Sequence, residues 1–538
     1  MAEAHASPPD GQAPSAETID QLRLKLENIV GVENVITDQA EREFYSQDIY
    51  KRGELVSLVI RPGMIDELSA GVAAATQAGF TVAPRGGGMS YTSGYIQEVP
   101  GAVMVDMCRM NRVKEINTED MYVTVECGCT WSQLHEALKD KGVRTPFWGT
   151  LSGIRATVGG ALSQNAIFFG SGQFGLATES VQSLKVVLAD GTIVPTGTLS
   201  TKGSTPFSRH YGPDLTGLFA GDTGAFGFKA EATFRLIRKP AFEDSVSFAF
   251  DEYDVCADAI CELTRAGIAS EVFGFDPNLA EIRLKRESIM KDIMSLKGVA
   301  TGGSSILEGV KDAAKVVLSG RRYMDEVVYT ANAVIEGNSK AVVEAGIAEA
   351  RRICKVKGRE IANSIPKIIR ANPFMPLNNV LGPEGQRWIP IHGIVPLSKA
   401  KETWKKIYDL FAEYKERMDK YEIIHGFLIS GASTNMFLIE PVMLWPDERF
   451  AIHERTLDDA VLKRIPKYDF VPEATALVDE IKNRLCRLFL EQGAAHLQIG
   501  KTYLYREGRD RETWKLLEGI KDLVDPQRRV NPGSLGLD

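Results

Sequence analysis

The pattern of hydrophobic and polar positions predicts alternating helices and strands over the first 240 residues. Apolar residues recur with helical spacing over 18–30, 65–78 and 131–141, whereas short apolar runs of strand length occupy 57–62, 81–84 and 102–106. Strand–helix–strand order of this kind predicts a compact β-α-β unit. Further strands are expected at 121–126, 181–189 and 229–237, so the N-terminal part is mixed α and β structure.

From about Phe242 the pattern changes to that of a second domain. Strands expected at 248–250, 329–335, 388–395 and 422–430 alternate with helices at 253–266, 339–357 and 400–417. This order favours an α+β domain with an antiparallel sheet. We therefore expect a disordered tail over 1–17, a first domain over 18–240, a second over 241–470, and a helical segment over 471–538 that returns to the first domain.

Length, charge and cysteine content exclude several classes of protein. A chain of 538 residues is too long for one core, and a net charge of -8 argues against binding to nucleic acid. The seven cysteines are scattered without a CxxC pair, which favours a reducing compartment, and we expect a cytoplasmic protein. The N-terminus lacks the apolar core of a secretory signal, and no run of about 18 apolar residues predicts a membrane span.

Three glycine-rich runs carry the strongest chemical signal. Residues 85–90 read Arg-Gly-Gly-Gly-Met-Ser after a strand, which indicates either a nest of backbone N–H groups for an anion or a plain tight turn. Residues 149–165 combine four glycines with hydroxyl side chains and regular apolar positions, as expected of a loop folded against an extended polar ligand. The third run, 221–227, precedes a strand.

Other motifs are excluded by their context. Residues 170–175 spell GxGxxG, but the next strand starts near Val181 and leaves no room for the helix of a dinucleotide-binding Rossmann unit. No two of the seven histidines have the spacing of a HExxH or HxH metal site, and neither a P-loop nor a GxSxG elbow occurs. We expect no metal site.

Five motifs in order resemble the vanillyl alcohol oxidase / p-cresol methylhydroxylase superfamily of flavoproteins. They lie at 84–90, 156–165, 184–191, 218–227 and 525–533. The resemblance implies an FAD-binding domain of the p-cresol methylhydroxylase type and an α+β cap domain that forms the substrate pocket. It implies FAD contacts from Pro84, Arg85, Gly86, Gly87, Gly88, Met89, Ser90, Thr150, Ser152, Thr157, Gly159, Gly160, Ser163, Asn165, Gly224, Gly227, Phe228 and Asn531.

The departures from the family pattern concern the flavin link and the substrate pocket. Many members attach FAD through a histidine where this chain has Met89, and others through a residue of the cap strand where it has Phe437 and Leu438; we therefore expect non-covalent FAD. Ala494 and Ala495 replace the phenolate-binding Tyr-Arg pair of the phenol-oxidising branch. Residues 430–436 lack both histidines of the D-lactate dehydrogenase branch, although 393–398 and 499–501 resemble that branch.

Six side chains are candidates for catalysis or substrate binding. His392, on the same face of its predicted strand as Trp388, is a candidate general base or orienting donor. Arg370 is a candidate anchor for a carboxylate or phenolate, and Glu440 lies in an apolar strand where a raised pKa is plausible. Each also has a purely structural interpretation, as do the candidates for substrate contact, Tyr91, Tyr503 and Tyr505.

The resemblance implies an oxidoreductase in which flavin N5 takes a hydride from a small alcohol, which we expect to be aromatic or hydroxybenzylic. Electrons then pass to O2 or to an acceptor protein such as a cytochrome. Two alternatives stay open: a D-2-hydroxy-acid dehydrogenase, and a non-redox flavin-assisted synthase. We expect a homo-oligomer, in the simplest case a homodimer.

Overall fold

Two sheets with flanking helices build the first unit of the chain. The computed structural model describes residues 14–282 and 328–537, and unit 1 comprises 14–166, 177–238 and 497–537 of these. Unit 2 comprises 167–176, 239–282 and 328–496. The chain re-enters unit 1 at Leu497 rather than at 471, because helix α16 (Pro472–Glu491) packs within unit 2.

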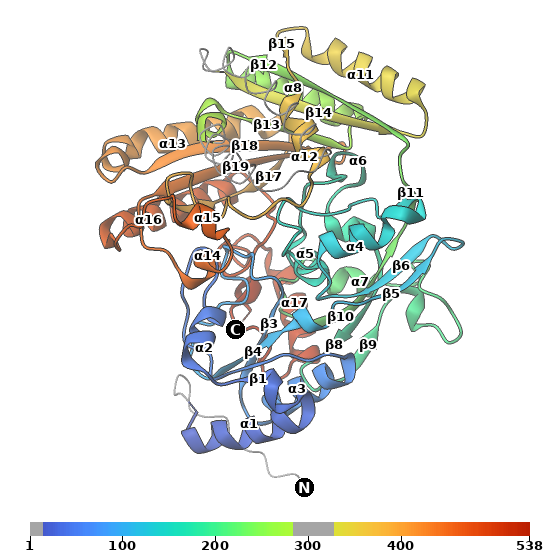
Figure 1. Cartoon of the computed structure of the whole chain (residues 1–538), viewed down its shortest axis with the longest axis vertical. Coiled ribbons are helices and arrows are strands. Elements are labelled where there is room, and N and C mark those ends of the chain that lie inside the picture. The colour runs from blue at the N-terminus through green and yellow to red at the C-terminus, as the bar shows by residue number, and fades with distance from the viewer. Residues whose placement is uncertain (1–13, 283–327, 538) are drawn as a thin grey trace. The chain divides into compact units, whose positions relative to one another are not determined.

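The smaller sheet of unit 1 is mainly parallel and ends at the first glycine run. Its strand order is β1 (Val35–Ile36), β2 (Leu58–Ile60), β4 (Ala102–Asp106) and β3 (Thr81–Arg85), and only β1 is antiparallel to its neighbour. Strands β2 and β4 are buried along their whole length, as expected of parallel strands covered on both faces. Helices α1 (Ala16–Val30) and α3 (Ile65–Gln77) lie side by side in this part of Figure 1 and share its core.

The second sheet of unit 1 is antiparallel. Its order is β5 (Val113–Asn117), β6 (Tyr122–Glu126), β10 (Phe228–Arg235), β8 (Val181–Val187) and β9 (Ile193–Pro195). Along β10, Phe228 and Ala230 face the core that holds α1 and α3, so Lys229 and Glu231 point to the opposite face.

The other elements of unit 1 are short helices, a strand pair and a C-terminal helix. They are α2 (Gln39–Tyr45), α4 (Trp131–Leu138), α5 (Val158–Gln164), α7 (Leu215–Leu218), β7 (Val143–Arg144) paired with β11 (Ile237–Arg238), and α17 (Arg511–Val524). Short 3-10 turns lie at Val32–Asn34, Met107–Arg109, Lys139–Lys141, Ala177–Ser180, Gly197–Ser200 and Ser534–Gly536.

Unit 2 is built on one antiparallel sheet. Along the sheet the strands are β15 (Arg359–Ile361), β12 (Phe242–Phe250), β14 (Tyr329–Gly337), β13 (Glu271–Phe275), β18 (Ile424–Ala432), β19 (Met436–Trp445) and β16 (Arg387–Pro390), with β17 (Gly393–Pro396) also paired to β19. Its helices are α6 (Ser171–Phe174), α8 (Tyr253–Ala266), α11 (Lys340–Cys354), α12 (Ser364–Ala371), α13 (Ala400–Lys420), α14 (Ala451–Glu454), α15 (Asp459–Leu462) and α16, and a 3-10 turn lies at Leu397–Lys399.

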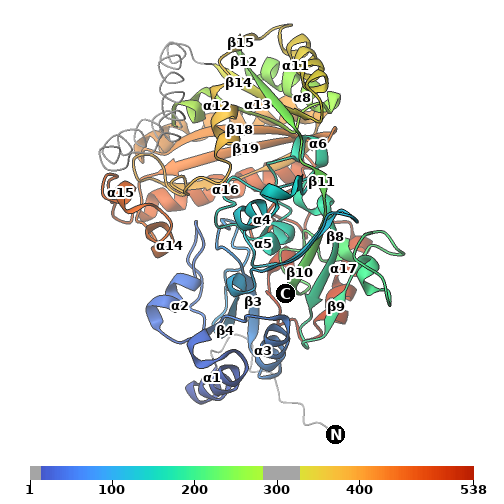
Figure 2. The ribbon, with the colours of Figure 1, turned by 45° about the vertical axis from the view of Figure 1, so that its right-hand side comes forward.

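One face of the unit 2 sheet is covered by α8, α11, α13 and α16, and Figure 2 shows α16 running along β19. Trp404 of α13 contacts Phe427 and Phe437 at ring-centroid distances of 6.2 and 6.4 Å. Since strand side chains alternate, Leu428, Ser430, Leu438 and Glu440 point to the opposite face. This second face carries the candidate residues of unit 2.

The expected fold class, a two-domain FAD-binding protein with an α+β cap and an antiparallel sheet, is confirmed. The run over 149–165, expected as a loop, contains helix α5. The strand expected at 388–395 is divided at residues 391–392 into β16 and β17. Of the tail expected at 1–17, residues 1–13 lie outside the described residues, and α1 already begins at Ala16.

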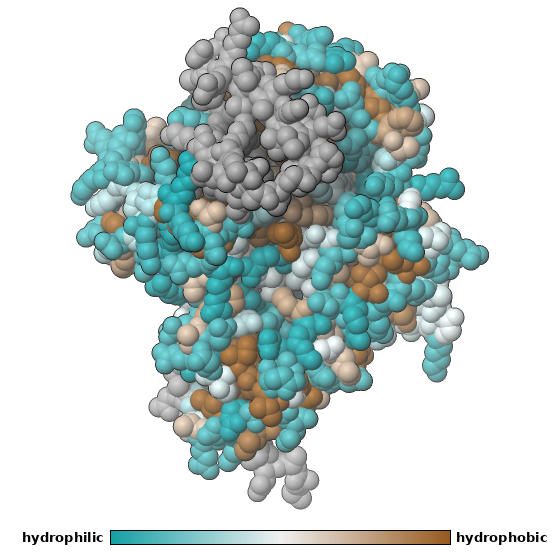
Figure 3. All heavy atoms as spheres, in the orientation of Figure 1, coloured by the Kyte–Doolittle hydropathy of each residue, from teal (hydrophilic) through white to brown (hydrophobic). Residues whose placement is uncertain are grey.

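No helix among the described residues is long and apolar enough to cross a membrane. The face shown in Figure 3 is mainly hydrophilic, and its hydrophobic atoms gather in small separate groups. This distribution is ordinary for a folded protein surface.

Candidate functional site

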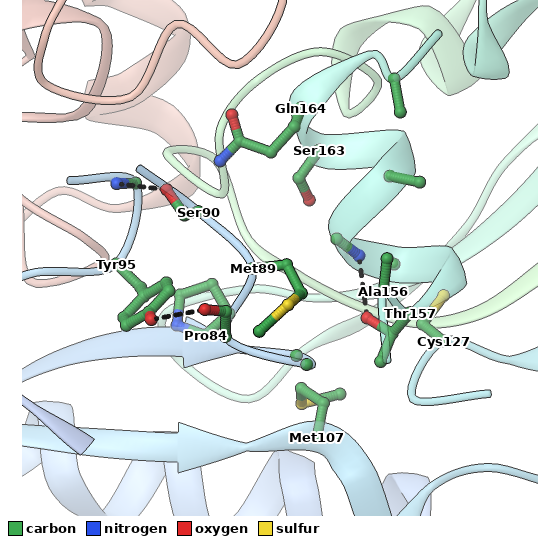
Figure 4. Close-up of a pocket in the computed structure, with 18 of the residues that line it drawn as sticks. Pro84, Met89, Ser90, Tyr95, Met107, Cys127, Ala156, Thr157, Ser163 and Gln164 are labelled. Atoms are coloured by element: carbon green, nitrogen blue, oxygen red, sulfur yellow. Dashed lines mark hydrogen bonds between the residues drawn. The ribbon is translucent and has the colours of Figure 1, made fainter. Parts of the chain in front are cut away.

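A large pocket in unit 1 lies where the three glycine runs meet. It encloses about 910 Å³, including its open mouth. Its walls are Pro84, Gly86, Gly87, Gly88, Met89, Ser90, Gly94, Tyr95, Met107, Cys127, Thr150, Ser152, Ala156, Thr157, Gly159, Gly160, Ala161, Ser163, Gln164, Ala166, Thr223, Gly227, Lys229 and Gln498. Figure 4 shows Met89 in the middle of this cavity, with Gln164 on one side and Cys127 on the other.

The first glycine run follows the parallel strand β3 and packs directly against the second run. A side chain at Gly87 would overlap the backbone carbonyl of Arg155, and one at Gly86 would overlap the hydroxyl of Thr157. Gly88 has φ of +73°, in the left-handed region that favours glycine. The glycines therefore let two backbone segments touch, and this contact forms one wall of the pocket.

Arg85 lies behind this loop rather than in the pocket. Its buried guanidinium carbon lies 4.9 Å from the ring centroid of Phe44, 4.7 Å from that of Tyr45 and 5.4 Å from that of Tyr95. A side chain at Gly88 would overlap this guanidinium. The structure thus makes Arg85 a cation–π support of the loop, where the sequence predicted a direct contact to the cofactor.

Several polar atoms in the pocket wall lack partners among the described residues. They include Oγ1 of Thr223 and Oε1 of Gln164, both shielded from solvent. Gln498 has a left-handed φ of +45° and donates from Nε2 to the Tyr91 hydroxyl at 2.8 Å. Because buried polar atoms are normally hydrogen-bonded, these groups fit a large polar ligand that supplies the missing partners.

Thirteen of the residues predicted to bind the cofactor line this pocket, and five do not. Asn165 ends α5 in a left-handed conformation and accepts a hydrogen bond from Thr178. Asn531 donates from its amide to the carbonyls of Gly94 and Thr223, so it braces two pocket loops. The others outside the pocket wall are Arg85, Gly224 and Phe228.

Sequence reasoning missed eleven residues of the pocket wall. Ala156, Ala161, Gln164 and Thr223 lie inside motifs that had been recognised, so the motifs themselves were the available signal. Met107, Cys127 and Lys229 follow or lie on strands β4, β6 and β10, and sheet pairing brings them to the site. The remaining four are Gly94, Tyr95, Ala166 and Gln498.

In unit 2, His392 is fully buried between β16 and β17. Burial, with a smaller contribution from His496, lowers the pKa of His392 to about 3. Burial favours the uncharged imidazole, which suits the orienting role more than the general-base role, and the assignment of His392 stays a prediction. The strand register pairs Pro390 with Val442 and Gly393 with Ile439, which places His392 opposite Glu440 on the second face of the sheet.

Arg370 is occupied by three carboxylates of unit 2. Its guanidinium contacts Glu271 at 3.0 Å, Glu243 at 2.7 Å and Glu336. Glu271 is buried and also accepts a hydrogen bond from the Gly170 backbone at 2.7 Å. The role of Arg370 as an anchor for a substrate carboxylate or phenolate stays a prediction, and in the structure its two terminal nitrogens already donate to these three carboxylates.

The remaining candidates lie in different places. Tyr91 is buried in unit 1 and reaches the pocket through Gln498. Tyr503 is buried and Tyr505 stacks beneath Arg509, whose guanidinium carbon lies 4.7 Å from its ring centroid; neither lines the pocket. Glu440 is partly exposed on β19. Among the described residues no group of three or more His, Cys, Asp or Glu side chains can hold a metal ion.

Comparisons with known proteins assign the cofactor. Residues 56–212 match the family described as "FAD binding domain", and 499–535 match "FAD linked oxidases, C-terminal domain". The mitochondrial D-lactate dehydrogenase [cytochrome] of Arabidopsis thaliana is 30% identical over 255 residues, which are 47% of this chain and 42% of that protein. The chain spans about half the length of the curated relatives it matches first.

Solved structures reproduce the fold over the whole chain. Substrate-bound p-cresol methylhydroxylase superposes with a TM-score of 0.73 over 99% of both chains, at 18% identity. An alkyldihydroxyacetonephosphate synthase has a TM-score of 0.67 over 98% of this chain and 87% of its own, at 15% identity. The chain therefore carries an FAD-binding domain, has FAD as its cofactor, and has the fold of the vanillyl alcohol oxidase / p-cresol methylhydroxylase superfamily.

Proposed function

We propose that the protein is an FAD-dependent oxidoreductase that oxidises a small alcohol, aromatic or hydroxybenzylic in character. The matches to FAD-linked oxidases and the open, glycine-lined pocket of unit 1 support an oxidoreductase. Bound FAD supplies the hydride acceptor, and the protein supplies orientation and electrostatics.

We base the choice of substrate class on the ion pairs that Arg370 makes. A 2-hydroxy acid or a phenolate needs a cation to hold its charge, and the sequence offered Arg370 for that role. In the structure three glutamates surround this guanidinium, and two of them are less than 10% exposed. A neutral substrate needs no such anchor.

The second face of the unit 2 sheet, opposite α8, α11, α13 and α16, is apolar, as the wall of a pocket for a neutral aromatic molecule would be. Phe273, Phe275, Leu428 and Leu438 lie on this face by strand alternation, next to the His392–Glu440 register pair. With its pKa lowered to about 3, His392 offers an uncharged ring nitrogen. We assign it the positioning of a substrate hydroxyl rather than removal of its proton.

The second candidate is a D-2-hydroxy-acid dehydrogenase, because the match to the Arabidopsis enzyme supports it. Anaerobic flavin reduction by matched panels of benzylic alcohols and D-2-hydroxy acids separates the two. Reduction by the benzylic panel alone supports the proposal, and reduction by D-lactate or glycolate alone overturns it. Product formed with no acceptor consumed identifies instead a flavin-assisted synthase.

We also propose that FAD is bound without a covalent link. Met89 lies in the pocket at the position where a histidyl attachment is expected, and a thioether forms no such bond. Phe437 and Leu438, at the second attachment position, are buried hydrocarbon side chains of β19.

The electron acceptor, assembly and location complete the proposal. We assign O2 or an acceptor protein as the electron acceptor, and a cytoplasmic homo-oligomer as the working form. Oxygen uptake measured against reduction of a dye or of cytochrome c tests the first assignment. Light scattering of the purified protein tests the oligomeric state, and cell fractionation tests the cytoplasmic location.

A further inference from the structure

Three sulfur-containing side chains line the pocket of unit 1 together. They are Met89, Met107 and Cys127, and Figure 4 shows Met107 and Cys127 on the side of Met89 away from Gln164. Met89 belongs to the first glycine run, Met107 follows β4, and Cys127 follows β6. The fold therefore brings sulfur from three separate segments to one cavity, and sulfur is the element of protein side chains that oxidants attack first.

Met89 is the most accessible of the three sulfur groups. It is partly exposed, whereas Met107 is 5% and Cys127 1% exposed. Met107 packs in the core that holds α1 and α3. Burial raises the pKa of the Cys127 thiol, and a protonated thiol is a poor nucleophile. An oxidant that enters the pocket therefore meets the Met89 thioether first.

The backbone on both sides of Met89 is held in place. The hydroxyl of Tyr95 donates to the Gly88 carbonyl at 3.2 Å, and the backbone N–H of Ile49 donates to the Ser90 carbonyl at 3.0 Å. These bonds fix the loop that carries the side chain into the middle of the cavity (Figure 4). A ligand that fills the pocket consequently lies against the Met89 side chain.

We propose that Met89 is an oxidation site, at which hydrogen peroxide converts the thioether to a sulfoxide and thereby lowers the affinity of the pocket for FAD. The proposal rests on FAD as the cofactor and on O2 as the proposed electron acceptor, because reoxidation of reduced flavin by O2 yields hydrogen peroxide. The device is a feedback by which the second product of the reaction limits the loaded enzyme.

The oxidation step is balanced by the peroxide itself. The Met89 sulfur attacks one peroxide oxygen, so that an S–O bond forms and the O–O bond breaks. The other oxygen takes the proton of the transferred oxygen and leaves as water. The sulfur loses two electrons, and the peroxide gains them.

The sulfoxide changes the polarity of the pocket wall at its centre. Its oxygen is a hydrogen-bond acceptor, whereas the neighbouring Met107 offers no donor and the Cys127 thiol only a weak one. A bound ligand would cover this oxygen and leave it without a strong partner. We therefore expect oxidation to weaken FAD binding by about tenfold, the effect of one unsatisfied polar group.

The first experiment forms peroxide inside the pocket. FAD-loaded protein is reduced with light and EDTA without oxygen, then reoxidised in air with catalase present, and its peptides are weighed by mass spectrometry. Catalase removes peroxide from bulk solvent, so the exposed Met64 and Met375, at 46% and 40% exposure, should stay reduced. Met89 should gain one oxygen about tenfold faster than either. Equal rates at the three residues, or an unmodified Met89, would overturn the proposal.

Flavin absorbance in the same experiment tests the proposed acceptor separately. Flavin that stays reduced in air would remove O2 as the acceptor, and peroxide added to flavin-free protein would then decide the role of Met89. After this treatment, wild type and the control Met64→Leu should bind FAD about tenfold more weakly in fluorescence titrations.

Met89→Leu keeps the side-chain volume and removes the thioether. Its FAD affinity should be the same before and after peroxide treatment, and methionine sulfoxide reductases should restore the affinity of the treated wild type. An equal loss of affinity in Met89→Leu would place the damage elsewhere and overturn the proposal. Thermal melting of each treated protein separates loss of binding from loss of folding.

Discussion

At the residue scale, burial decides what His392 can do. Its pKa is lowered to about 3, and we therefore expect its ring to be neutral between pH 5 and 8. We expect His392→Gln to slow anaerobic flavin reduction by about tenfold or less, the value of one positioning hydrogen bond. The dependence of this rate on pH between 5 and 8 should be the same in both proteins. A much larger decrease in the stopped-flow rate of flavin reduction, together with the loss of an ionisation near pH 6.5 from its pH profile, would instead support a general-base role for His392.

A second histidine with a lowered pKa, the partly buried His425, links stability to pH. It stacks on Phe411 with a centroid distance of 4.1 Å, and burial, aided by Lys415, lowers its pKa to about 4. A histidine whose folded pKa is depressed stabilises the fold above its unfolded pKa of 6.5, and this contribution is lost as pH falls towards 4. At pH 5 the loss is about 2 kcal/mol.

His425→Phe removes this titration and keeps the stacked ring. We expect denaturant unfolding to give similar free energies for both proteins at pH 7.5, and a variant more stable by about 2 kcal/mol at pH 5. Other groups, such as Asp276, whose pKa burial raises to about 6, change both proteins alike and cancel in the difference. A difference that stays constant with pH would contradict the prediction.

At the element scale, substitutions at two glycines of the pocket distinguish a role in loop packing from a role in cofactor contact. A side chain at Gly87 overlaps the backbone at Arg155, whereas one at Gly160, in the first turn of α5, meets only Oγ1 of Thr157, at 3.3 Å. Gly87→Ala should therefore lower both the melting temperature and FAD affinity. Gly160→Ala should preserve or raise the melting temperature of the flavin-free protein, because alanine favours helix by about 1 kcal/mol.

For Gly160→Ala we nevertheless expect FAD affinity to fall by about tenfold or more, since the added methyl occupies the pocket side of the helix. Fluorescence titration with FAD and calorimetric melting of the flavin-free protein give the two quantities. Wild-type affinity in Gly160→Ala would remove this turn from the cofactor site.

The charge cluster around Arg370 ties four elements of unit 2 together. Glu243, Glu271 and Glu336 come from β12, β13 and β14, and the arginine comes from α12. Arg370→Met leaves two buried carboxylates without their cation and should destabilise the protein by about 3–5 kcal/mol at pH 8. Burial raises the pKa of Glu271, so protonation should reduce this loss at pH 5. Glu243→Gln, at a half-exposed position, is the control and should change little at either pH.

The individual elements show how much of the fold and of the site the sequence alone could predict. Periodic elements such as α3, α8 and β4 were predicted within one or two residues, because their apolar spacing is local information. Helix α5 was missed because two glycines disguise its pattern, and the short strand β13 gives little signal. Strand pairing between segments far apart in sequence brings Met107, Cys127 and Lys229 to the pocket. It also buries His392 and so lowers the pKa of its imidazole. Neither effect can be predicted from local sequence.

At the scale of the whole molecule, the pocket collects segments that are remote in sequence. Its walls come from 84–107, 127–166 and 223–229, and from Gln498 after the whole of unit 2. A ligand that contacts all of them stabilises the folded state over the unfolded state, where these segments separate. At a free concentration one hundred times its Kd, FAD should add about 2.7 kcal/mol.

This stabilisation also tests whether FAD is bound reversibly. Acid precipitation should leave a colourless pellet and all flavin in the supernatant, because Met89 offers no attachment chemistry. Refolded or gently stripped protein should melt at a lower temperature, and added FAD should raise this temperature with a logarithmic dependence on concentration. Gly160→Ala serves as the control: its flavin-free form should melt at the wild-type temperature or above it, and its FAD-dependent rise should need a higher FAD concentration. Flavin retained in the precipitate would show a covalent link and require a different attachment residue.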